Sequence, residues 1–528
     1  MTRTIQVGRA AGVLVPLFSL PSTSSWGIGE IGDLAPMCRW LRQSGTRVLQ
    51  LLPINEMAPG QTSPYSAISA MAIDPIYISM GAVHDFNALG GEPRLELADQ
   101  VALTAARRAD RIDYGSVRRA KDAALRLAFS YFWDTEWVRG TARAGSFAAF
   151  CSWEEWWLAD YALYRALRER SGGRSWMEWD EPLRRRDPEA LEEARSELDR
   201  EVLFYQYQQW VADDQWETAR ESCAPVALFG DFPFMVSTDS ADVWARQHLF
   251  RFDASVGVPP DAFSATGQDW GLPVYRWNVM QAEDYRWLRE RARRSAKLFD
   301  GYRIDHLVGF YRTYSRPLGS TEGTFDPALE DEQVALGERL MDIFMRSGPT
   351  IIAEDLGIVP DFVRTSLTAL GIPGYKVFRW ERAWKEPGQP FRDPAEYPSL
   401  AVATTGTHDT DPLVTWWEAA DDDERRAFLA LPSMQALAGA EGGAAAIPFS
   451  AALRDAVLEA LYRSPAELLL IPLPDIFGWP DRINTPATVN DDNWTWRLPW
   501  PVDRLETQPE AQERARTLRA WAEASGRG

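Results

Sequence analysis

A cation and a carboxylate stand two positions apart at the end of a short apolar run, in the stretch GYRIDH at residues 301–306. Apolar or aromatic residues alternate with charged ones, which predicts a β-strand with Arg303 and Asp305 on one face. The simplest interpretation is a surface ion pair, which contributes little to stability. Charged groups gathered at the end of a buried strand are also typical of functional sites.

Carboxylates end three further predicted strands, and together they indicate a site. Asp231, Glu354 and Asp409 stand near the ends of the apolar runs at 225–234, 350–357 and 401–409. Singly each is ordinary, because Asp is common in turns. In a parallel barrel, however, the carboxyl ends of all strands meet at one rim, which is where active sites form. Strict alternation would put His408 and Asp409 on opposite faces, so both can serve one site only if their strand ends or bends there.

Two carboxylates in different protonation states suit the chemistry of the glycosidic bond. One attacks or stabilises the sugar centre as an anion, and the other gives a proton to the leaving oxygen. Arg303 favours the ionised form of Asp305, whereas Glu354 lies in an apolar strand and faces other carboxylates, which favour its protonated form. This predicts Asp305 as the nucleophile and Glu354 as the general acid and base. Further side chains expected to bind sugar hydroxyls are Asp409, His306 and His408.

Eight short apolar runs have the character of parallel strands that are buried on both faces. They lie at residues 12–18, 47–54, 225–234, 301–307, 350–357, 374–380, 401–409 and 467–476. Helical patterns lie between most of them, the clearest at 34–43, 284–300 and 361–370. Eight βα units predict an α/β fold, a (β/α)8 TIM barrel.

About half of the chain is expected outside a bare barrel, which needs roughly 250 residues. Residues 85–215, after the second strand, are rich in Arg, Glu, Ala and Trp and predict an inserted helical subdomain. Residues 236–283, after the third strand, predict a loop-rich subdomain over the strand ends. The tail after the eighth strand is too short for a β-sandwich of about 100 residues. We therefore expect residues 1–528 to form a single catalytic barrel with no C-terminal β-sandwich.

The composition excludes several classes of partner. A net charge of −20 disfavours nucleic acid and anionic membranes. No run approaches the roughly 20 apolar residues of a membrane span, and the N-terminus lacks the apolar core of a signal peptide. Three widely spaced cysteines are typical of reduced thiols in a cytoplasmic protein. Either a monomer or a homodimer is compatible with the sequence.

No cofactor and no metal site is predicted. Residues 27–32, GIGEIG, match a dinucleotide-binding pattern, but they begin nine positions after residue 18, where the predicted strand ends. That motif requires its glycines in the turn directly after a strand. The four histidines form no HxxxH pair and lie apart from the cysteines.

Several motifs resemble known proteins. GYRIDH, IIAEDLG and TGTHD occur in the order seen in the α-amylase clan. The longer segment 240–277, SADVWARQHLFRFDASVGVPPDAFSATGQDWGLPVYRW, is more specific and resembles the amylomaltases, which are bacterial 4-α-glucanotransferases. SPYSAISA at 63–70, DRINTPA at 481–487 and NWTWRLP at 493–499 are similar to the same family.

This resemblance implies an enzyme that cleaves an α-1,4-glucan, holds the glucosyl part covalently and passes it to the 4-OH of another glucan, without metal or organic cofactor. The family's nucleophile, acid/base and third carboxylate fall on Asp305, Glu354 and Asp409. Its donor-site partners fall on Tyr65, Asp231, Arg303, His408 and Asn484. Gln268 and Trp270 match the loop that covers the bound glucan. We expect residues 257–271, with Phe263 and Trp270, to bind the acceptor and exclude water.

The chain departs from the family pattern at four places, which bear on chain-length preference and individual subsites. They are Thr410, where Asn is usual; Leu272, in place of the Asn of GNP; Glu381, where Asp is common; and residues 15–19, VPLFS, where His-Pro-Thr-Ser is usual. On the residues alone two alternatives stay open. One is an amylase-like hydrolase of α-1,4-glucans, and the other is a catalytically silent glucan-binding protein, against which the intact carboxylate set argues.

Overall fold

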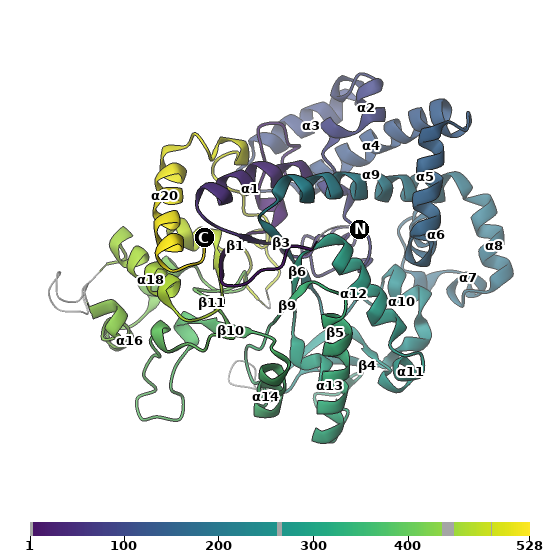
Figure 1. Cartoon of the computed structure of the whole chain (residues 1–528). Coiled ribbons are helices and arrows are strands. Elements are labelled where there is room, and N and C mark those ends of the chain that lie inside the picture. The colour runs from purple at the N-terminus through teal and green to yellow at the C-terminus, as the bar shows by residue number, and fades with distance from the viewer. Residues whose placement is uncertain (1–3, 261–266, 436–447, 487) are drawn as a thin grey trace.

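The structure is a computed structural model that describes residues 4–260, 267–435, 448–486 and 488–528 (Figure 1). In the described part of the chain, eight parallel strands close into a barrel in the order β1-β12-β11-β10-β9-β6-β3-β2. The strands are β1 (Ala10–Leu14), β2 (Val48–Gln50), β3 (Ala227–Phe232), β6 (Gly301–Ile304), β9 (Thr350–Ala353), β10 (Gly374–Val377), β11 (Ala401–Thr404) and β12 (Leu468–Pro472). Each overlaps one predicted run, so the predicted TIM barrel is confirmed.

A layer of buried apolar side chains fills the barrel below the strand ends, and Phe229 and Ile352 belong to it. Side chains two positions further along a strand face the same interior. Asp231 therefore lies above Phe229, and Glu354 lies above Ile352. The strand register sets Arg303 between Asp231 on β3 and Ile352 on β9. The apolar layer thus forms the floor under the charged groups.

Helices surround the barrel, as expected for βα units (Figure 1). The predicted helices at 34–43, 284–300 and 361–370 are present as α1 (Leu34–Gln43), α12 (Arg286–Leu298) and α14 (Asp361–Leu370). Further helices on the barrel are α13 (Glu330–Met345), α18 (Ala451–Arg463) and α20 (Pro509–Ala524). Among the described helices, none combines the length and the apolar character needed to cross a membrane.

The segment between β2 and β3 is helical. It contains α2 (His84–Ala88), α3 (Leu97–Arg108), α4 (Tyr114–Phe132), α5 (Ala142–Trp153), α6 (Glu155–Arg170), α7 (Glu181–Arg184), α8 (Pro188–Glu197) and α9 (Asp199–Cys223). Aromatic rings from three of these helices pack together, with Phe132 and Tyr207 5.2 Å apart and Phe147 and Trp210 5.5 Å apart. Aromatic side chains therefore form much of the core of this insertion.

A second, four-stranded antiparallel sheet differs from the expected loop-rich segment at 236–283. Its order is β5-β4-β7-β8, with β4 (Phe250–Val258), β5 (Gln268–Tyr275), β7 (Thr313–Pro317) and β8 (Thr324–Asp326). Register shifts interrupt the pairing of β4 with β5, and Pro273 stands inside β5. These irregularities interrupt the alternation of apolar and polar residues from which strands would have been predicted. The sheet is completed by β7 and β8, which come from beyond β6.

Candidate active site

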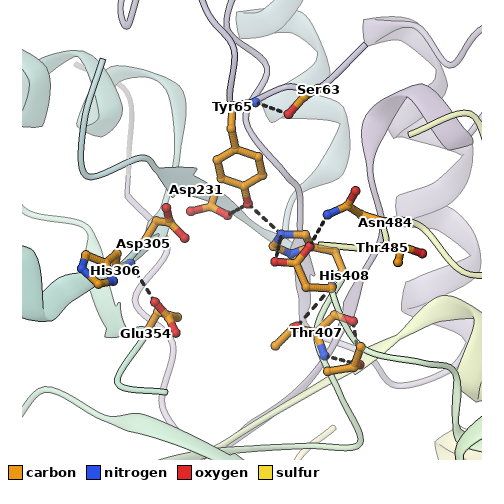
Figure 2. Close-up of polar contacts among 12 residues, drawn as sticks. Ser63, Tyr65, Asp231, Asp305, His306, Glu354, Thr407, His408, Asn484 and Thr485 are labelled. Atoms are coloured by element: carbon orange, nitrogen blue, oxygen red, sulfur yellow. Dashed lines mark hydrogen bonds and ion pairs between the residues drawn. The ribbon is translucent and has the colours of Figure 1, made fainter. Parts of the chain in front are cut away.

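The four predicted carboxylates lie at the carboxyl ends of their strands. Asp231 is in β3, Asp305 and Glu354 directly follow β6 and β9, and Asp409 is in the turn after β11. Figure 2 shows Asp305 and Glu354 on one side of the site, with Tyr65, His408 and Asn484 on the other. The site is therefore divided between two groups of polar residues.

Arg303 joins two of these carboxylates. Its guanidinium Nη1 lies 2.6 Å from Asp231 Oδ2, and Nη2 lies 2.7 Å from Asp305 Oδ1. Burial lowers the pKa of Arg303, but the charges of Asp231 and Asp305 outweigh it and hold that pKa above its ordinary value. A buried guanidinium loses its hydration, which only such paired charges compensate. Arg303 therefore stays cationic and holds Asp305 in one orientation.

The surroundings of Glu354 shift the pKa of its carboxyl. Burial raises its pKa, Arg303 lowers it and the charge of Asp305 raises it, which leaves the pKa at about 7 against an ordinary 4.5. The backbone N–H of His306 donates to Glu354 Oε2 at 2.8 Å. His306 has a φ of 43°, a left-handed conformation that a residue with a side chain adopts rarely. This conformation places the backbone amide of His306 at the Glu354 carboxyl.

With Glu354 as the predicted general acid, the rate of glycosidic-bond cleavage is expected to fall as pH rises through about 7, because the carboxyl then loses its proton. The same raised pKa makes ionised Glu354 unfavourable in the fold. Its contribution to stability is complete below its unfolded pKa and is lost as pH rises through about 7. We expect the Tm of Glu354→Gln to change less than that of the wild type between about pH 5 and about pH 8.

The check is kcat/KM against pH for a sugar donor with a glycosidic bond and for the corresponding glycosyl fluoride, whose leaving group needs no proton. The fall in kcat/KM near pH 7 should appear with the first donor and be absent with the fluoride. The same fall in kcat/KM near pH 7 with both donors would assign that fall to a group other than Glu354.

His306 also forms one wall of a groove beside the carboxylates. Burial lowers the pKa of His306 to about 4, so its ring is neutral near pH 7. Trp270 meets this ring edge-on, with centroids 4.7 Å apart, and donates its indole N–H to Gln268. The groove has a volume of about 190 Å³ and is lined by Gln268, Trp270, His306, Val308, Tyr314, Phe325 and Ile358, among others. Gln268 and Trp270 thus line this groove, and in the described part of the chain no hydrogen bond joins them to Asp305 or Glu354. Phe263 lies outside the described residues.

Tyr65 connects the two sides of the site. Its hydroxyl donates to Asp231 Oδ2 at 2.7 Å and lies 3.2 Å from His408 Nε2. The rings of Tyr65 and His408 stack with centroids 5.5 Å apart, and Trp494 packs against both. Tyr65, Asp231, Arg303 and His408 therefore form one connected network.

Asp409 and Asn484 lie together on the other side. Asn484 Nδ2 donates to Asp409 Oδ1 at 2.6 Å, and His408 Nε2 lies 3.4 Å from Asp409 Oδ2. Strand β11 ends at Thr404, so strict alternation no longer applies at residues 408 and 409. Both side chains face the site because they stand in a turn, which removes the difficulty that the sequence raised.

The sequence did not single out three residues that contact this part of the site. Trp494 packs on Tyr65 and His408, and Arg379 and Arg482 bind the turn that carries Asp409. Trp494 and Arg482 lie in the motifs NWTWRLP and DRINTPA, so the family resemblance could have identified these two residues. In the described parts of the chain, no group of three or more His, Cys, Asp or Glu side chains is arranged to hold a metal ion.

A parallel barrel that carries an arginine-bound carboxylate and a carboxyl of raised pKa at its strand ends has the arrangement that enzymes of the glycosidic bond require. The model of one family, described as 4-α-glucanotransferase, matches residues 15–503. This chain therefore belongs to the 4-α-glucanotransferase family.

Similar proteins cover nearly the whole chain. The 4-α-glucanotransferase of Thermus thermophilus is 32% identical over 97% of this chain and 100% of its own length. That of Synechocystis is 34% identical over 93% of this chain and 94% of its own. The amylomaltase of Streptococcus agalactiae, solved in complex with acarbose, superimposes with a TM-score of 0.82 at 26% identity, covering 98% of this chain and 100% of its own. The amylomaltase of Corynebacterium glutamicum gives 0.77 at 25% identity, covering 97% of this chain and 75% of its own.

Proposed function

We propose that this protein is a retaining 4-α-glucanotransferase that moves α-1,4-linked glucan segments from a donor malto-oligosaccharide or starch-like glucan to the 4-OH of an acceptor glucan or glucose. The observation that carries this proposal is the placement of Asp305, bound by Arg303, beside Glu354, whose pKa is about 7. Arg303 binds the Asp305 carboxylate, and the Glu354 carboxyl is poised to carry a proton near neutral pH.

In the first step, an Asp305 oxygen forms a bond to the anomeric carbon as the bond from that carbon to the glycosidic oxygen breaks. Glu354 gives its proton to that oxygen, and the released glucan leaves with a free 4-OH. In the second step, the acceptor 4-OH attacks the anomeric carbon, its proton passes to the Glu354 carboxylate, and Asp305 is released. Two inversions at the same carbon retain its configuration.

The two sides of the site are proposed to take different parts of the glucan. Glu354 protonates the leaving oxygen, so the groove on its side, with His306 and Trp270, takes the leaving glucan and then the acceptor. The donor ring lies on the other side, where Tyr65, Asp231, His408, Asp409 and Asn484 offer acceptors and donors for sugar hydroxyls. Asp409 strengthens its contacts as the ring distorts towards the transition state.

The test is the product profile from maltotriose. We expect glucose together with oligosaccharides longer than maltotriose. Glucose and maltose alone would favour the hydrolase alternative. Binding of maltotriose without turnover would favour the silent binding protein.

Replacing Trp270 with alanine is expected to lower the ratio of transfer to hydrolysis about three- to tenfold, because an aromatic contact of about 0.5–1.5 kcal/mol with the acceptor is lost and water gains access. Oligosaccharide products and reducing ends are measured in the same reaction. Trp153→Ala is the matched control, because Trp153 is 81% exposed in the helical insertion. An unchanged ratio in Trp270→Ala would remove Trp270 from acceptor binding.

A cytoplasmic location stays part of this proposal. The described residues include three free cysteines, at 38, 151 and 223, which suits a reducing compartment.

A further inference from the structure

The turn at residues 405–411 carries both His408 and Asp409, yet it is not part of the barrel ladder, because β11 ends at Thr404. The Asp409 side chain is 42% exposed, and its contacts to Asn484 and His408 do not reach back to the barrel wall. A misplacement of about 1 Å can cost about a hundredfold in rate. The position of Asp409 therefore depends on what holds the backbone of this turn.

Arg482 binds the turn from one side. Its Nη2 donates to the carbonyl oxygen of Asp409 at 2.8 Å, and its Nη1 pairs with the Asp411 carboxylate. Its Nε donates to the carbonyl oxygen of Asn484 at 2.7 Å. One guanidinium thus joins the backbone of Asp409 to the backbone of Asn484, the residue whose side chain binds the Asp409 carboxylate.

Arg379 binds the same turn from the short helical turn Phe378–Trp380 that follows β10, the strand next to β11. Its Nε and Nη1 donate to the carbonyl oxygens of Thr405 at 3.2 Å and Asp411 at 2.8 Å. These are the first and last residues of the turn. Between them, the Thr410 hydroxyl accepts from the Thr407 N–H and donates to the Thr407 carbonyl, both at 3.0 Å. Thr410, a departure from the family pattern, thus closes the turn internally.

We propose that Arg482 and Arg379 are positioning residues that hold the turn so that Asp409 meets the distorted donor ring. This inference rests on the proposed function, in which Asp409 binds sugar hydroxyls most strongly in the transition state. Arg379 acts through backbone carbonyls, and Arg482 acts through two backbone carbonyls and the Asp411 carboxylate. Their removal should therefore lower kcat while the KM for the acceptor stays nearly constant, because acceptor binding belongs to the groove beside His306.

The experiment compares Arg482→Ala, Arg482→Lys, Asp411→Ala and the Arg482→Ala/Asp411→Ala double variant in maltotriose disproportionation. Arg107→Ala is the matched control, because Arg107 also binds one carboxylate, that of Glu92, and one carbonyl, that of Ser25. Its side chain is 30% exposed against 28% for Arg482. The Tm of every variant is measured alongside kcat and acceptor KM.

We expect Arg482→Ala to lower kcat about 10- to 100-fold with acceptor KM within about twofold. Arg482→Lys should be intermediate, because lysine keeps the charge near Asp411 but not three directed N–H groups. The double variant should lose less than the product of the single losses, because the two side chains act as a pair. Arg107→Ala should lose a similar amount of Tm and no kcat.

A kcat of Arg482→Ala within about twofold of Arg107→Ala would overturn the inference, and so would a loss confined to acceptor KM. Asp409→Asn separates this failure from failure of the proposed function. If Asp409→Asn loses kcat while Arg482→Ala does not, only the positioning role is wrong. If Asp409→Asn turns over like the wild type, the role of Asp409 fails and the positioning role fails with it.

Discussion

Glu354→Gln is expected to lower kcat for maltotriose disproportionation by about 10²–10⁴-fold, the usual contribution of general acid–base catalysis. Glutamine keeps the shape of the side chain and its acceptor oxygen for the His306 N–H, but it carries no exchangeable proton for the leaving oxygen. The loss should therefore lie in kcat. The unfolding temperature should not fall, because the variant removes a carboxyl that burial already disfavours as an anion.

Two controls make this result specific. Donor cleavage should persist with α-maltosyl fluoride, because fluoride leaves without a proton. Asp33→Asn removes another buried carboxyl with a pKa of about 7, which lies just before α1 and is bound by Ser25 and Glu30. That variant should keep its kcat. Wild-type turnover of maltotriose by Glu354→Gln would reject Glu354 as the acid and base.

Asp305→Asn is expected to lower kcat by about 10⁴-fold or more, because removal of a nucleophile eliminates the covalent route and leaves only the contribution of binding and charge. The fold should survive, because Arg303 keeps its pair with Asp231 at 2.6 Å. Turnover by Asp305→Asn is measured with maltotriose and with α-maltosyl fluoride, and both should be lost. Retained turnover with either donor would contradict the assignment.

The same strand provides the matched control. Asp300 stands immediately before β6 and pairs with the buried Arg220 at 2.7 Å, as Asp305 at the other end pairs with Arg303. Asp300→Asn should lower the Tm, because it leaves a buried arginine short of its partner. Its kcat should stay near that of the wild type. We thus expect Asp300, before the start of β6, to serve stability and Asp305, after its end, to serve catalysis, as in other barrels of this kind.

Local patterns were sufficient to predict the barrel and the four carboxylates at its strand ends. Buried parallel strands are short apolar runs, and alternation alone predicted that Arg303 and Asp305 share one face. Helix α14 was predicted with the bounds it has. The donor-side residues Tyr65 and Asn484 were found through family motifs, since nothing in their own neighbourhoods indicates that they lie near Asp231 and Asp409.

Features that depend on distant pairing were not predictable. The contact between Arg303 and Asp231 spans 72 positions and follows from the register of β6 on β3. The antiparallel sheet joins β4 and β5 to strands from beyond β6, across irregular pairing. Arg379 and Arg482 bind backbone carbonyls, which every residue has, so the residue types around them in the sequence do not indicate their role.

The most direct test is mass spectrometry of Glu354→Gln after brief incubation with α-maltosyl fluoride and acid quenching. The proposed mechanism predicts that Asp305 is glycosylated, because fluoride leaves unaided, and that the adduct persists, because no base activates an acceptor. The added mass should equal one maltosyl group on the peptide containing Asp305, and Glu354→Gln/Asp305→Asn should show none. Release of fluoride without an adduct, or an adduct on Asp231 or Asp409, would contradict the assignment of Asp305 as the nucleophile.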